Sequence, residues 1–161
     1  MAVVEEFLEA NARYAARFDK SHLPMPPGRK VAVLVCMDAR IDPAKALGLE
    51  EGDAHVIRNA GGRAKDALRS LIISQQLLGT REVVVIHHTD CGMLTFTDDQ
   101  LRAKLEADLG QQTSQAFLSF TDLDKSVRDD VAELRSSPLL LKVPVRGFVY
   151  DVQTGRLREV A

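Results

Sequence analysis

Two short apolar runs, at residues 31–36 and 82–88, constrain the fold of this chain more than any other feature. The first reads VAVLVC and the second contains VVVI, so both are aliphatic and rich in β-branched residues. A half-exposed strand alternates polar and apolar residues, whereas a strand covered on both faces shows an uninterrupted apolar run. The two runs therefore predict central strands of a parallel sheet.

Helices are predicted between and after these strands. Asp42 before Pro43 is a favourable start for a short helix, and Thr97 with Gln100 is typical of a capping box. The full set of predicted helices is 3–18, 43–47, 63–78, 97–109 and 121–134, and the further strands are 54–57, 143–152 and 157–160. We expect the charged residues of the helix at 121–134 to lie on a solvated face.

The alternation of strands and helices predicts an α/β fold. We expect a mostly parallel sheet of order 2-1-3-4, flanked by helices, with an antiparallel edge strand added by a hairpin through Thr154 and Gly155. A length of 161 residues suits a single domain, residues 1–161.

Residues 1–28 are predicted to form a helical arm on this domain. Apolar residues recur at helical spacing in the first helix, and the following SHLPMPPGRK holds three prolines that prevent its continuation. A tethered amphipathic helix can bury its apolar stripe on a second copy of the chain. We therefore expect a homodimer or a higher homo-oligomer.

Charge and hydropathy exclude several classes of partner. Lys and Arg total 21 and Asp and Glu total 23, which leaves no basic excess for nucleic acid or an anionic membrane surface. No apolar run reaches the roughly 18 residues that a membrane span requires. Glu5, Glu6 and Glu9 stand where a signal peptide has basic residues, so a cytoplasmic protein is expected.

Reactive residues follow both central strands. Cys36 ends the first, and His88 with Cys91 ends the third. If these strands are neighbours, the three side chains meet at the carboxyl edge of the sheet, where open α/β folds bind ligands. Two thiolates and an imidazole suit Zn²⁺, and three protein ligands leave a fourth position open. His87 should point to the opposite face, because side chains alternate along a strand.

Other residues near this edge carry polar groups. Arg40 can hold the carboxylate of Asp38 with its planar guanidinium, although the two could also form a plain surface ion pair. Gly61 and Gly62 follow the second strand, and their amides are candidates for contacting a small anion. Asp90 is interpreted as a turn residue.

The pattern Cys36-x-Asp38-x-Arg40 followed by His88-x-x-Cys91 resembles the β-class carbonic anhydrases, in particular their short bacterial single-domain members. The resemblance covers most of the chain. It implies a zinc enzyme with one Zn²⁺ per chain that interconverts CO₂ and bicarbonate through zinc-bound hydroxide. Cys36, His88 and Cys91 would be the ligands, and Asp38 and Arg40 the gating dyad.

The resemblance also implies a closed state in which Asp38 itself binds the metal. The sequence departs from many family members at Ala39, where serine is common, and it has no clear equivalent of a glutamine that assists bicarbonate binding in the plant-like members. Two alternatives stay open: a zinc hydrolase of CS₂ or COS on the same scaffold, and a non-enzymatic zinc or redox-sensing domain.

Overall fold

A computed structural model describes residues 2–161 and contains one five-stranded sheet. The strands are β1 (Val31–Cys36), β2 (Ala54–Asn59), β3 (Glu82–His88), β4 (Val145–Tyr150) and β5 (Leu157–Glu159). Their order is β2-β1-β3-β4-β5, with β5 antiparallel to β4 and the other neighbours parallel. The predicted strand order and antiparallel edge are confirmed.

The helices are α1 (Val3–Ala15), α2 (Pro43–Leu47), α3 (Ala64–Leu78), α4 (Asp98–Leu109) and α5 (Leu123–Ser136), with short 3₁₀ turns η1 (Ala60–Gly62) and η2 (Gly92–Leu94). Thr97 and Gln100 form the expected capping box. Helix α5 begins later than predicted, because Asp122 is the N-cap and accepts a hydrogen bond from the Lys125 amide. Strand β4 is shorter than predicted.

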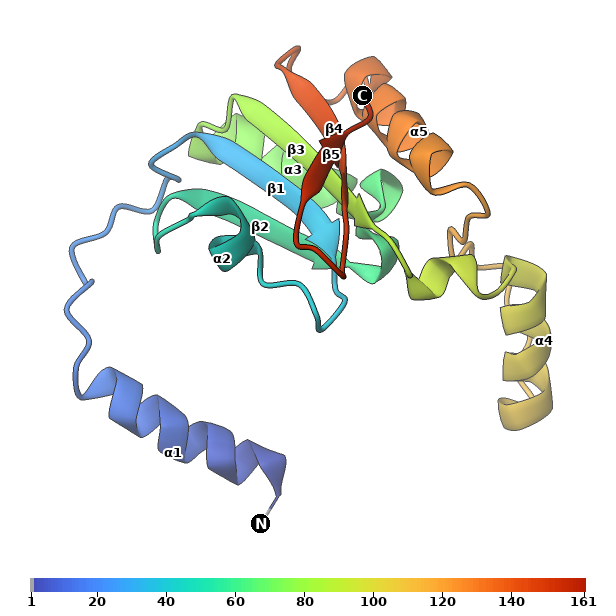
Figure 1. Cartoon of the computed structure of the whole chain (residues 1–161), viewed down its shortest axis with the longest axis horizontal. Coiled ribbons are helices and arrows are strands. Elements are labelled where there is room, and N and C mark those ends of the chain that lie inside the picture. Colours follow the sequence, from blue (N-terminus) through green and yellow to red (C-terminus); the bar gives the residue numbers. More distant parts are fainter. Residues whose placement is uncertain (1) are drawn as a thin grey trace.

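The main core lies between the sheet and the helices α3 and α5 (Figure 1). Its largest fully buried aliphatic members include Leu34, Leu71 and Leu134. Helix α5 approaches β4 closely at Gly147, where a Cβ atom would lie 2.5 Å from the side chain of Val127. Glycine at this position therefore allows the helix to pack directly on the strand.

The opposite face of the sheet has less cover within one chain. Val33, Val35, Ile41 and Ile86 are buried there, while Phe148 at its margin is only partly buried. Helix α1 lies apart from the sheet at the end of the extended segment that leads to β1 (Figure 1), and none of its described residues is buried.

Helix α4 also projects from the domain, on the side away from α1 (Figure 1). The chain that returns from it is fixed by Asp98, whose carboxylate accepts hydrogen bonds from the amides of residues 117, 118 and 119 and from the Ser119 hydroxyl. Within residues 2–161, no helix combines the length and the hydropathy needed to cross a bilayer.

Candidate metal centre

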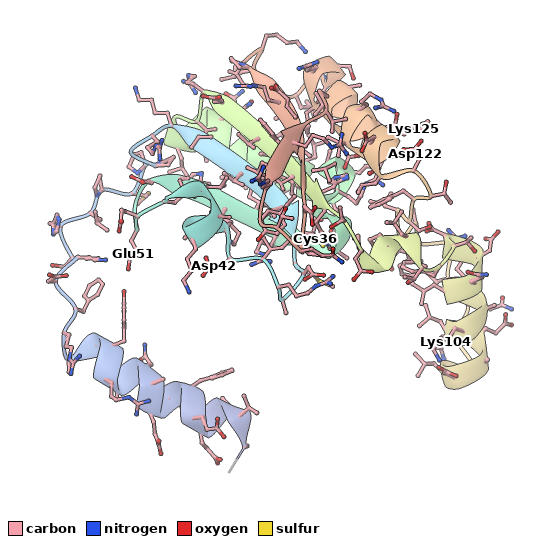
Figure 2. All side chains as sticks on the ribbon, viewed as in Figure 1. Cys36, Asp42, Glu51, Lys104, Asp122 and Lys125 are labelled. Atoms are coloured by element: carbon pink, nitrogen blue, oxygen red, sulfur yellow. The ribbon has the colours of Figure 1, made fainter. Side chains whose placement is uncertain are left out.

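Cys36, His88 and Cys91 converge at the carboxyl edge of the sheet. Their ligand atoms all lie within 4.8 Å of one another, and all three side chains are buried. Cys36 ends β1 and His88 ends β3, and these strands are parallel neighbours. Figure 2 shows Cys36 at this edge, near the segment that leads to α4. The sheet topology thus brings together residues that are 55 positions apart, from Cys36 to Cys91.

The two thiols differ in their affinity for a proton. Hydrogen bonding from Cys91 lowers the pKa of Cys36 to about 4, and the Gly61 amide donates to the same sulfur at 3.3 Å. The pKa of Cys91 is raised, first by its hydrogen bond to Cys36 and then by burial. The hydrogen bond from the Gly61 amide therefore favours the thiolate form of Cys36.

His88 presents a nitrogen toward the two sulfurs. Its Nδ1 atom lies 2.8 Å from the carbonyl oxygen of Thr89. A carbonyl only accepts, so Nδ1 carries the proton and Nε2 keeps its lone pair in the neutral ring. Nε2 is buried and has no hydrogen-bond partner. A buried imidazole nitrogen without a hydrogen-bond partner, beside two sulfurs, is a donor set that fits a metal ion.

Asp38 lies beside this centre and is held by Arg40. The Arg40 amide and Nε donate to one carboxylate oxygen at 2.8 and 3.0 Å, and Nη2 donates to the other at 2.8 Å. That second oxygen is 3.8 Å from Nε2 of His88. The hydrogen bonds from Arg40 hold the pKa of Asp38 well below its ordinary range, so the carboxylate is ionised beside the three candidate ligand side chains.

A cavity of about 420 Å³ opens onto Cys36, Asp38 and Cys91. Gly61 and several apolar side chains complete its lining, among them Met93, Phe96, Leu101 and Phe117. Leu101 belongs to α4 and Phe117 to the returning segment, so the projecting part of the chain forms one wall. The lining suits a small uncharged molecule better than a large anion.

Comparison with known proteins gives a consistent result. A family model described as carbonic anhydrase matches residues 31–115, more than half of the chain. β-Carbonic anhydrase 1 of Mycobacterium tuberculosis is 47% identical to this chain over 99% of both sequences. The chain belongs to the β-carbonic anhydrase family. It is therefore an enzyme of that family, and the resemblance in its motifs is confirmed.

Two further relatives extend the comparison. A crystal structure of carbonic anhydrase from Streptococcus mutans matches this β-carbonic anhydrase fold with a TM-score of 0.94 and 49% identity, over 100% of this chain and 99% of that one. A carbon disulfide hydrolase of Saccharolobus solfataricus is 34% identical, over 97% of this chain and 88% of that protein.

The two glycines expected near substrate have other contacts. The Gly61 amide points at the Cys36 sulfur, while its backbone still lines the cavity. Gly62 packs against the strands, where a Cβ atom would lie 2.9 Å from the Cys36 amide nitrogen and 3.0 Å from the Ile86 carbonyl oxygen. Both glycines thus contact Cys36, one at its sulfur and the other at its backbone. His87 points to the α5 side, as expected, and bonds Ser126.

Sequence reasoning did not predict the contacts of three residues that support the site. Arg58 donates to the carbonyl oxygens of Cys36 and Asp38 at 2.8 Å, and so holds the chain after β1. Asp90 accepts from Arg40 Nη1 at 2.8 Å, in addition to forming the expected turn. The sequence places both residues near the carboxyl edge of the sheet, Arg58 at the start of the stretch that leads to Gly61 and Gly62, but it does not indicate these hydrogen bonds.

Asp130 is the third, and it corrects the expectation of a fully solvated charged face on α5. Its carboxylate is buried and bonded to Arg63 and His87. A signal was present, because Asp130 lies three residues after Val127 and four before Leu134, on the apolar stripe of the helix.

Proposed function

We propose that this chain is a zinc-dependent carbonic anhydrase that hydrates carbon dioxide reversibly to bicarbonate and a proton. The observation that carries the proposal is the convergence of two buried sulfurs and one orphaned imidazole nitrogen beside an ionised aspartate and an apolar cavity. The 47% identity to a β-carbonic anhydrase over the whole chain supports it.

Cys36, His88 and Cys91 would hold one Zn²⁺ per chain. When bound, zinc lowers the pKa of a water molecule and so supplies hydroxide near neutral pH. Two sulfurs and a nitrogen are a ligand set that zinc accepts, and three protein ligands leave one position open. Burial lowers the pKa of His88, but its hydrogen bonds to Cys36 and to the Thr89 carbonyl, followed by the charges of Cys36 and Asp38, raise it overall. Metal binding therefore competes with protons for these groups.

Asp38 and Arg40 would control the geometry of attack. The carboxylate of Asp38 can accept a hydrogen bond from the reacting hydroxyl group, which directs a lone pair of that group toward CO₂. Arg40 makes the carboxylate available for this contact and competes with the metal for it. Met93, Phe96 and Phe117 would receive the uncharged substrate and keep bulk water from it.

We further propose that the working form is at least a homodimer. Val3, Val4, Phe7 and Leu8 of α1 are each 59–65% exposed, an apolar stripe without cover in the single chain. The sheet face around Phe148 is also only partly covered. A second copy that places its α1 on such a surface would bury both.

A second candidate activity is hydrolysis of CS₂ or COS. The apolar cavity would also receive these linear molecules, and the similarity to a carbon disulfide hydrolase favours keeping the candidate. Parallel assays of CO₂ hydration and CS₂ hydrolysis on one preparation discriminate the two. We expect CO₂ to be the better substrate, and a higher kcat/KM for CS₂ would reverse the assignment.

The role of the dyad is tested by Arg40→Ala, measured by stopped-flow CO₂ hydration together with zinc content. Hydration should fall while zinc stays bound, because Asp38 loses its guanidinium partner. Arg29→Ala is the matched control, since Arg29 pairs with the carboxylate of Asp53 on the surface away from the centre. Full activity in Arg40→Ala would contradict the proposed role.

A further inference from the structure

A buried polar cluster lies behind the metal centre, on the face of the sheet that α5 covers. At its middle is Asp130, which is 3% exposed. One carboxylate oxygen accepts from Arg63 Nη2 at 2.8 Å. The other lies 3.0 Å from the Ala64 amide nitrogen and 3.1 Å from Nε2 of His87. The proposed reaction uses none of these groups.

The proton positions in this cluster follow from its partners. Nε2 of His87 faces only acceptors, the Asp130 carboxylate and the carbonyl oxygen of Gly62 at 3.1 Å, so Nε2 carries a proton. Burial raises the pKa of Asp130, but the interactions with His87 and Arg63 lower it by more, so the pKa lies below its ordinary value. Asp130 is therefore a buried, ionised carboxylate that acts only as a hydrogen-bond acceptor.

These bonds hold the C-terminal end of the turn η1. His87 donates to the carbonyl oxygen of Gly62, the last residue of the turn, and Asp130 accepts from the amide of Ala64, two residues further on. Gly61 directly precedes Gly62, and its amide donates to the sulfur of Cys36. These hydrogen bonds, joined by the peptide bond between Gly61 and Gly62, connect α5 to a residue 94 positions earlier in the sequence.

A packing contact connects the same two regions. The ring of His87 stacks on Phe120, with the centroids 5.5 Å apart and an angle of 11° between the planes. Phe120 packs against the cluster formed by Cys36, Cys91 and Met93. A displacement of His87 would therefore be transmitted to the ligands by contact as well as through η1.

We infer that Asp130 is a positioning residue for the metal centre, which holds the Gly61 amide against the Cys36 sulfur. An amide that donates to a thiolate fixes the direction of the sulfur and withdraws part of its charge. Partners of this kind typically contribute about 10- to 100-fold to metal affinity. The inference rests on the proposed zinc centre and adds to it a support that acts from outside the ligand set.

The test compares Asp130→Asn with Asp129→Asn. Asparagine keeps the shape of Asp130 but turns an NH₂ group toward donors, because both carboxylate oxygens accept bonds in the native chain. Asp129 is the next residue of the same helix, and its carboxylate is exposed and paired with Lys125. It controls for the loss of one negative charge from α5.

Two measurements report on the centre itself. The first is competition of the full-length chain with a chromophoric chelator for zinc, and the second is the sulfur-to-metal charge-transfer absorption of the cobalt(II)-substituted protein. We expect Asp130→Asn to hold zinc about 10- to 100-fold more weakly and to shift the charge-transfer band. Asp129→Asn should match the wild type in both.

The inference would be overturned if Asp130→Asn lowered thermal stability alone, with zinc affinity and absorption equal to those of Asp129→Asn. If Asp130→Asn does not fold, the same two measurements are made on Arg63→Met, because this variant removes one donor to Asp130 and keeps the apolar stem of the side chain. It should weaken zinc binding in the same direction, and unchanged binding would refute the inference. Failure of the wild type to bind zinc would instead refute the proposed function, and this inference with it.

Discussion

Gly62 offers a direct test of how closely the fold and the metal centre depend on each other. Its φ angle is +62°, and a Cβ atom would lie 2.9 Å from the Cys36 amide and 3.1 Å from the Val35 carbonyl carbon. Alanine in the left-handed region costs roughly 1–2 kcal/mol. Forcing a methyl group into closely packed backbone adds about 1–3 kcal/mol. Gly62→Ala should therefore lower the free energy of unfolding by about 2–5 kcal/mol.

Gly48→Ala separates the two contributions. Gly48 has nearly the same φ, +64°, but open space where its Cβ would stand, so only the roughly 1–2 kcal/mol of backbone cost applies. Urea unfolding at one protein concentration gives both values. Relieving the clash at Gly62 moves the backbone of Cys36 by about half an ångström, enough to weaken a site, so zinc retention should fall in Gly62→Ala alone. Equal losses of stability in the two variants would refute this reasoning.

Three further outcomes are expected. Phe7→Glu should convert a dimer to monomer in light scattering, because it places a charge on the apolar stripe of α1; an unchanged mass would remove α1 from the interface. The hydrogen bond from Ser119 lowers the pKa of Asp98 to about 2. The stability that Asp98 contributes relative to Asp98→Asn should therefore be complete above its unfolded pKa of about 3.9 and disappear as the pH falls toward 2. A difference in stability that persists at pH 2 would contradict the assignment. In the zinc-free chain, iodoacetamide should label Cys36 before Cys91, because the Gly61 amide donates to the Cys36 sulfur and stabilises its thiolate; peptide mass spectrometry showing the reverse order would contradict this.

The sequence was sufficient for the features that depend on local pattern. Apolar runs located β1 and β3, and capping residues located the starts of α2 and α4. Because parallel neighbours end at one edge, the strand order alone brought Cys36 and His88 together. The start of β4 was less predictable, since Pro144 has no amide to donate to the ladder and only its carbonyl oxygen is bonded there, by the Val83 amide.

The supporting residues of the site depend on contacts between distant elements, which no local pattern encodes. Arg58 contacts the chain after β1 from the neighbouring strand, and Asp130 reaches η1 from a helix near the other end of the chain. A charged residue on a helix is usually solvated, so the composition of α5 suggested the wrong environment for Asp130. Its position on the apolar stripe was the better indicator.

The most direct test of the proposed centre is zinc-edge X-ray absorption on the chain purified after expression with ample zinc, combined with metal content. We predict one zinc per chain, coordinated by two sulfur atoms, with nitrogen or oxygen in the remaining positions, and one sulfur in Cys91→Ser if the metal is retained. A chain that carries no zinc, or zinc without two sulfur neighbours, would contradict the account.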